Sequence, residues 1–327
     1  MAPVAAAVLP HPPLLVPELA GAAAPELDPL RAACHEALST VLAAADLTLI
    51  IGDGRAWAIP GPTATGSFHP YGAEVEVALP ALVDLADLAL PGLGDLAFPV
   101  PADPDLPALT DLDPPGVADP DLPDLPAPAR LSELPLSLAV AAHLLAKLDP
   151  LPGGVAGADR PPGAGRLWAA TVPRSIGPRA AAAIGRALNS AGRFGLVVMA
   201  DLSACRTERA PGAFRPDAAD FDARVGDAFR AGAPQRLLAL DPAKATDLLV
   251  TGRVPLQVLA GTFAPDPAPD DPPDRPRPPS GRDRSGDHDL AAGPRRQDET
   301  LAGVRGRVLY EGAPYGVGYL VALLSAP

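Results

Sequence analysis

The distribution of apolar and polar positions along the chain predicts strands that alternate with helices. The apolar runs 4–9 and 47–51 are typical of buried strands, while 25–45 repeats its apolar residues at helical spacing. Charged and apolar residues alternate over 74–79, which indicates an edge strand. Further helices are predicted at 134–148, 176–191, 217–231, 241–250 and 254–260, and further strands at 167–172, 194–200, 307–311 and 317–324. The pattern predicts an α/β layered domain with a central mixed sheet and flanking helices.

Two proline-rich segments interrupt this alternation. The segment 84–130 contains eleven prolines and a recurring Asp-Leu-Pro triplet, and 264–300 is rich in Pro, Asp and Arg. Proline at this density removes amide donors and blocks both helices and central strands. We therefore predict that both segments are disordered inserts. Because neither insert separates two complete patterns, the sequence predicts a single domain over 1–327.

The net charge of −13 belongs to the inserts. The segment 84–129 has ten Asp and no Lys or Arg, and 264–300 has nine acids against six Arg, so the remainder is neutral. Without a basic face we expect no nucleic-acid partner. Two distant cysteines, Cys34 and Cys205, exclude a disulfide framework and favour a reducing compartment. Apolar runs are short and prolines cut the first one, so we expect a cytoplasmic protein with no signal peptide or membrane span.

Polar residues follow three of the predicted strands. They are His11, Asp53 and the pair Asp201 and Ser203. Ligands of α/β sheets bind at the carboxyl ends of strands, so these residues are the candidates for a pocket. Structural roles remain open for each of them: His11 could cap its strand, Asp53 could form a Gly-Asp-Gly turn, and Asp201 could hold the Ser203 amide.

Three stretches resemble a known family. They are V-L-P-H-P-P-L-L-V-P-E at 8–18, the block 200–261 that opens with A-D-L-S, and A-P-Y-G-V-G-Y at 313–319. They are similar to the LigB-type class III extradiol ring-cleavage dioxygenases and to their Memo-like relatives, over most of the chain outside the inserts. The resemblance implies an α/β fold and an Fe(II) site of two histidines and a carboxylate, which leaves room for a catecholate and dioxygen. A further histidine would act as acid and base.

The family roles transfer to this sequence only in part. His11 matches the first metal-binding histidine, but Gly52-Asp53-Gly54 stands where the second is expected, and Ala204 replaces the acid/base histidine of D-L-S-H. Asp53 and His69 are the further metal-ligand candidates, although His69 also fits a surface loop. The metal carboxylate is not identified, and Asp247 lies on a predicted helix outside the stretch that matches best.

Three functional hypotheses follow. The first is a LigB-like class III extradiol dioxygenase protein, an aromatic ring-opening oxidoreductase fold with a degenerate site that holds Fe(II) or no cofactor. The alternative is a non-catalytic module of the same fold that binds a small aromatic ligand or a protein partner. The third is a hydrolase that uses the Cys205 thiol beside Arg206. The oligomeric state stays open.

Overall fold

The computed structural model describes residues 2–80, 82–83, 129–148, 165–264 and 303–326. Both predicted inserts therefore lie outside the described residues, except at their ends. The first insert was predicted to run to residue 130, but Ala129 and Arg130 already belong to a strand. The boundary is wrong by two residues because a short, exposed strand has little apolar character.

Nine strands form one mixed sheet within the described residues, in the order β4-β3-β6-β2-β7-β1-β9-β8 with β5 beside β3. Their bounds are β1 Ala5–Leu9, β2 Leu47–Gly54, β3 Ala58–Ser67, β4 Glu76–Ala78, β5 Ala129–Glu133, β6 Arg166–Pro173, β7 Gly195–Met199, β8 Arg305–Gly312 and β9 Tyr319–Ser325. The central strands β6, β2, β7 and β1 are parallel, while β9 and β8 continue the sheet antiparallel from β1. The predicted α/β class and mixed sheet are confirmed.

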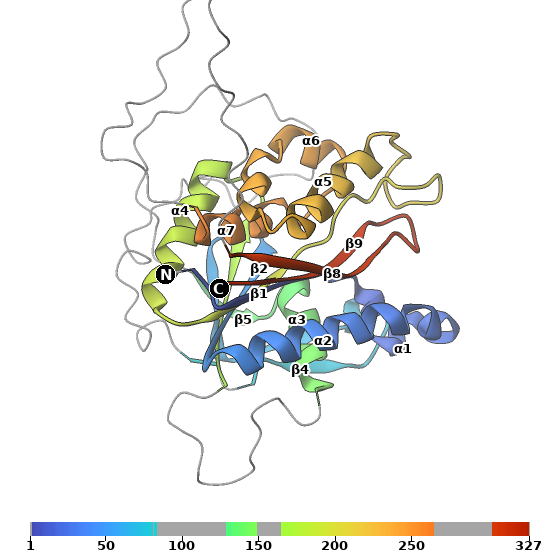
Figure 1. The fold of residues 1–327 in the computed structure, drawn as a ribbon. Coiled ribbons are helices and arrows are strands. Elements are labelled where there is room, and N and C mark those ends of the chain that lie inside the picture. The colour runs from blue at the N-terminus through green and yellow to red at the C-terminus, as the bar shows by residue number, and fades with distance from the viewer. Residues whose placement is uncertain (1, 81, 84–128, 149–164, 265–302, 327) are drawn as a thin grey trace, which may run out of the picture.

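Helices cover both faces of this sheet (Figure 1). Their bounds are α1 Pro17–Ala20, α2 Asp28–Ala44, α3 Leu136–Ala146, α4 Pro178–Leu188, α5 Ala218–Arg230, α6 Pro242–Asp247 and α7 Arg253–Thr262. One apolar core lies between the sheet and α2 and α3, and the other lies between the sheet and α4, α5 and α7. Short 3-10 helices lie at Pro13–Leu15, Gly21–Leu27, His69–Tyr71, Asn189–Ala191 and Pro234–Ala239. Among the described residues, none of the helices has the length and apolar character needed to cross a bilayer.

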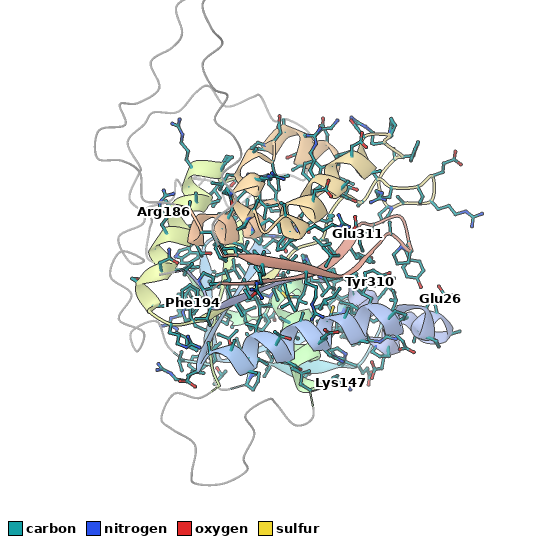
Figure 2. The ribbon with its side chains drawn as sticks, in the orientation of Figure 1. Glu26, Lys147, Arg186, Phe194, Tyr310 and Glu311 are labelled. Carbon is teal, nitrogen blue, oxygen red and sulfur yellow. The ribbon has the colours of Figure 1, made fainter. Side chains whose placement is uncertain are left out.

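Sequence chemistry explains several of these elements. The buried run of β7 begins next to Phe194, which is fully buried (Figure 2). Asp241 caps α6 by accepting a hydrogen bond from the Lys244 amide at 3.1 Å, and Pro242 occupies the first helical position.

Helices α4 and α7 pack closely at Gly185, where an added Cβ would lie 2.1 Å from the Val258 carbonyl oxygen. Side chains larger than hydrogen are therefore excluded at this crossing.

Two strands were missing from the sequence prediction. Strand β3 contains two prolines and several exposed positions, and β5 is exposed at four of its five residues. Neither has the continuous or alternating apolar pattern that identifies strands in a sequence. Both strands nevertheless matter, because β5 and the first residue of β3 line the pocket described below.

Candidate functional site

The carboxyl ends of four parallel strands meet at one edge of the sheet. His11 follows β1, Asp53 is the penultimate residue of β2, and Asp201 follows β7. Strand β7 lies between β1 and β2, so these three ends are neighbours. The predicted convergence of three strand ends is thus confirmed. The fourth end is that of β6, which pairs with β2 and is followed by Arg174.

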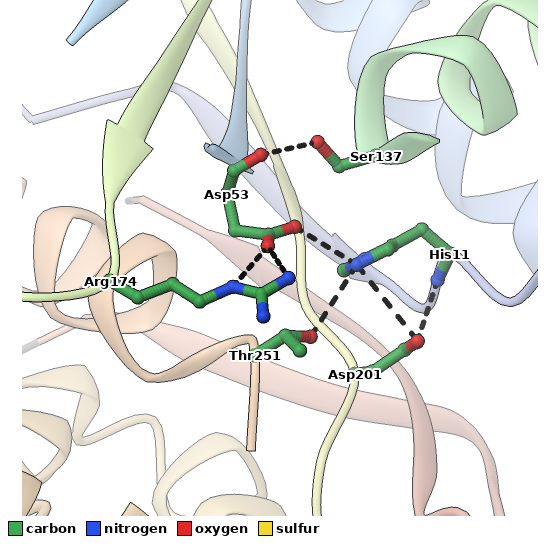
Figure 3. Close-up of polar contacts among 6 residues, drawn as sticks. All are labelled: His11, Asp53, Ser137, Arg174, Asp201 and Thr251. Carbon is green, nitrogen blue, oxygen red and sulfur yellow. Dashed lines mark hydrogen bonds and ion pairs between the residues drawn. The ribbon is translucent and has the colours of Figure 1, made fainter. Parts of the chain in front are cut away.

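Asp53 connects the polar side chains of this edge (Figure 3). Its Oδ1 lies 3.0 Å from His11 Nε2, and its Oδ2 accepts a hydrogen bond of 2.7 Å from Arg174 Nε. Arg174 Nη2 contacts the same Oδ2. The Ser137 hydroxyl of α3 donates to the Asp53 carbonyl oxygen at 2.9 Å, which fixes the backbone as well. Asp53 is therefore a strand residue held on both sides, and the interpretation as a turn former is wrong.

Asp201 and Thr251 complete the surroundings of His11. Asp201 Oδ1 accepts a hydrogen bond of 2.7 Å from the His11 backbone amide, and its Oδ2 lies 3.9 Å from Nε2. The Thr251 hydroxyl, from the segment between α6 and α7, lies 3.5 Å from Nε2. The other ring nitrogen of His11, Nδ1, is buried and has no hydrogen-bond partner among the described residues. The histidine is thus oriented through Nε2 and has one free nitrogen.

The three ionisable groups shift one another's pKa values. Burial alone would lower the pKa of His11, but the negative charges of Asp201 and Asp53 outweigh it and raise this pKa. Burial tends to raise the pKa of Asp53, yet the hydrogen bond and charge of His11, together with Arg174, lower it. The pKa of Asp201 is raised, because burial exceeds the effect of His11. The pair His11–Asp53 is therefore ionised over a wider pH range than the isolated groups would be.

His11, Asp53 and Arg174 line a pocket of about 1070 Å³. Strand β5 and the start of α3 form another of its walls. Apolar and hydroxyl side chains make up most of the remaining lining: Ala56, Ala58, Leu131, Leu134, Leu136, Ser132, Ser137, Thr171 and Ser175. An apolar surface with a few charged and hydroxyl groups among it is typical of small-molecule sites.

The other predicted site residues lie elsewhere. His69 is exposed and lines a second pocket of about 950 Å³ with Glu74, Glu76 and Glu133, so the structure does not bring it to His11. Ser203 is fully buried, and both its amide and its hydroxyl donate to the Asp222 carboxylate at 2.9 Å. The interpretation that Asp201 holds the Ser203 amide is therefore wrong.

Two more candidates are placed away from the site. Asp247 is exposed near the end of α6. Cys205 is buried, and burial raises the pKa of its thiol, so the reactive thiolate that the hydrolase hypothesis needs is disfavoured. His35 and His143 lie in α2 and α3, as predicted.

The donors around His11 do not fit the ferrous centre that the resemblance implies. Such a centre needs two imidazoles and a carboxylate on one face of the metal. Here one imidazole is present, its Nε2 faces Asp53, and the Arg174 guanidinium already neutralises that carboxylate. No group of three or more His, Cys, Asp or Glu side chains within the described residues is arranged to hold a metal ion. A second cation beside Arg174 would be repelled by its charge.

Comparisons with known proteins identify no family. No family model matches the chain, and no curated protein matches it. Among solved structures, the chain is similar to the crystal structure of the uncharacterized protein JW3007 from Escherichia coli K12. That similarity has a TM-score of 0.45 and 11% sequence identity, over 98% of this chain and 99% of that chain. It establishes no activity.

Proposed function

We propose that this protein is an extradiol dioxygenase-like domain that binds a small aromatic molecule in the His11 pocket and does not open its ring through ferrous iron. The observation that carries this proposal is the chain of contacts from His11 Nε2 to Asp53 and from Asp53 to Arg174. These contacts hold the imidazole in the pocket lining and engage its Nε2 and both Asp53 carboxylate oxygens, so these three atoms are not free to bind a metal. The resemblance in the three quoted motifs supports the same class.

The side chains of the pocket account for binding a hydroxylated ring. The leucines of β5 and α3 supply an apolar wall, and His11 belongs to the same lining and has a buried Nδ1 without a hydrogen-bond partner among the described residues. A ligand hydroxyl that pairs with Nδ1 would remove the cost of leaving a buried polar atom unsatisfied. With its pKa raised above the usual value near 6.5, His11 can also exchange a proton with such a ligand near neutral pH.

An iron-dependent ring-cleaving enzyme is the second candidate. One observation favours it: two carboxylates, Asp53 and Asp201, lie within 4 Å of His11 Nε2. A non-catalytic role in binding a protein partner is the remaining alternative.

Metal content and ligand binding separate these candidates. Protein purified without chelator is analysed for iron, and then incubated with Fe(II), catechol and air while the yellow ring-cleavage product is followed. We expect substoichiometric iron and no yellow product, but a change in the His11 ring resonance when catechol is added. The variant His11→Ala should lose catechol binding, and His69→Ala, in the other pocket, should keep it.

Two results would contradict the proposal. Stoichiometric iron that is lost in His11→Ala, with yellow product, would favour the oxygenase. Catechol that leaves the His11 resonance unchanged at millimolar concentration would favour the protein-binding alternative.

A further inference from the structure

Arg174 uses only one side of its guanidinium to hold Asp53. Its Nε and Nη2 both contact Asp53 Oδ2, while the third nitrogen, Nη1, points away from Asp53 (Figure 3) and has no hydrogen-bond partner among the described residues. The side chain is 62% exposed although the carboxylate it holds is only 5% exposed. The guanidinium fork offers donors in fixed directions, so the free side remains available to a second oxyanion.

Hydrogen bonds from a buried arginine hold the backbone of the segment that carries Arg174. Arg253, at the start of α7, is buried and donates to the Ile176 carbonyl oxygen at 3.0 Å and to the Arg174 carbonyl oxygen. Gln257 Oε1 accepts a further hydrogen bond from Arg253 at 2.9 Å. The Arg174 backbone and side chain are thus both held in place. A donor that is fixed before binding loses little conformational entropy when a ligand arrives.

The lining of the pocket carries more positive than negative charge. Arg55, Arg130 and Arg174 line it, against Asp53 and Glu133. Asp53 is already balanced by its two cationic neighbours. Arg55 is exposed and forms no ion pair with any described residue. Hydroxyl groups of Ser132 and Ser175 lie in the same lining.

We infer that the pocket selects a small organic ligand that carries an oxyanion, either a carboxylate or a phosphate. The oxyanion binds the free side of Arg174 and Arg55, while the apolar part of the ligand packs along β5 and the start of α3. This inference rests on the proposed function, because the anion would occupy the same pocket as the aromatic ligand.

The test compares anionic and neutral probes on the full chain. Benzoate, inorganic phosphate and the neutral benzyl alcohol are titrated separately, with calorimetry and with the amide resonances of 174–176 as readouts. We expect benzoate to bind at least about tenfold more tightly than benzyl alcohol, since a hydrogen bond between a carboxylate and a guanidinium is stronger than one to a neutral hydroxyl. If inorganic phosphate competes better than benzoate, the oxyanion is a phosphate; the reverse order assigns a carboxylate.

Substitutions locate the oxyanion. Arg174→Gln should weaken benzoate binding about tenfold, and Arg55→Gln should weaken it less, since its side chain is solvated. Arg209→Gln, an exposed arginine on the loop before α5, is the matched control and should change nothing. Arg55→Gln keeps the test valid if Arg174→Gln destabilises the site, because Arg55 has no described structural partner.

The outcomes distinguish failure of the oxyanion inference from failure of the proposed function. If benzyl alcohol and catechol bind in the pocket but neither anion binds more tightly, the inference is overturned and the proposed function stands. If no probe shifts the resonances of 174–176 or His11, both fall. Equal affinities of wild type, Arg174→Gln and Arg55→Gln for benzoate would also overturn the inference.

Discussion

Replacing Asp53 by Asn should lower the pKa of His11 and destabilise the fold in a defined pH range. Asp53 Oδ1 lies 3.0 Å from His11 Nε2, and both side chains are nearly buried, at 5% and 4% exposed. Asparagine has nearly the same shape but no charge. The substitution therefore removes the ionic part of the contact and leaves the packing intact.

The magnitude follows from the geometry of the pair. Two unit charges 3.0 Å apart attract by about 5 kcal/mol at an effective dielectric constant of about 20, before desolvation is subtracted. Hydrogen bonds to charged groups contribute about 1.5–3 kcal/mol net. Asp53→Asn should therefore lower the pKa of His11, because the raising effect of the Asp53 charge and hydrogen bond is lost, and should cost about 1.5–3 kcal/mol where both groups are ionised. The lost ion pair between Arg174 and Asp53 adds little to this cost, because water solvates the exposed guanidinium instead.

The sign of each pKa shift sets the pH range. His11 has a raised pKa, so its contribution to stability is complete below its unfolded value of about 6.5 and is lost as the pH rises through the folded value. Asp53 has a lowered pKa, so its contribution is present above about 3.9 and is lost as the pH falls through the folded value. The raised pKa of Asp201 acts in the opposite direction, and part of this shift comes from the Asp53 charge, which Asp53→Asn removes. The stability difference should therefore be largest between about pH 4 and 6.5.

Two measurements check this expectation. Histidine Cε1–H resonances are titrated against pH, with the His11 signal assigned from His11→Gln, and urea unfolding is measured at pH 5.5 and pH 9. Asp53→Asn should lose about 1.5–3 kcal/mol at pH 5.5 and less at pH 9. Asp247→Asn, an exposed carboxylate of α6, is the control and should change neither quantity. An unchanged or higher pKa of His11 in Asp53→Asn, or an equal loss at both pH values, would refute the reasoning.

Two further predictions concern packing and thiol chemistry. Gly185→Ala should cost about 1–3 kcal/mol or more in urea unfolding, because its Cβ would lie 2.1 Å from the Val258 carbonyl oxygen. Gly61→Ala, whose Cβ would meet the Leu131 carbonyl oxygen at an ordinary 3.4 Å, should change little, and equal effects would contradict the close packing of α4 and α7. Cys205 should react with a maleimide at pH 7 only on unfolding, since burial raises the pKa of its thiol. A cysteine introduced at the exposed Ser190 should react at once, and fast labelling of native Cys205 would revive the hydrolase hypothesis.

The buried elements were predictable because their patterns are local. The runs that became β1, β2, β6 and β7 are continuous in apolar residues, and α5 and α6 begin near the expected positions. Strands β3 and β5 were not predictable, because pairing with each other and with β4 stabilises them more than their own composition does. Strands β3 and β5 lie on opposite sides of a proline-rich segment of the sequence, so their pairing joins distant parts of the chain. Tertiary pairing of this kind leaves no local signal.

The candidate site was predictable in position but not in chemistry. Parallel strands place their carboxyl ends at one edge, so His11, Asp53 and Asp201 could be grouped from the sequence. The contact from Thr251 to His11 spans 240 residues, and that from Arg174 to Asp53 spans 121. Asp222, which holds Ser203, was also missed, since an acid inside an amphipathic helix normally suggests a solvated face. No periodicity in the sequence indicates such contacts.

Arg174, too, follows the carboxyl end of a parallel strand, which is where ligands of α/β sheets bind. The segment 167–172 was recognised as a strand, and Arg174 follows it just as Asp201 follows β7. The β2–β6 register pairs Asp53 with Val172, so Arg174 lies two residues beyond that pair and its side chain reaches Asp53. The Arg174 guanidinium places a permanent positive charge beside the Asp53 carboxylate. Without Arg174, that carboxylate would be available to a ferrous ion. The missing second imidazole and this guanidinium therefore both disfavour the ferrous centre that the resemblance implies, while the fold that positions them is the same.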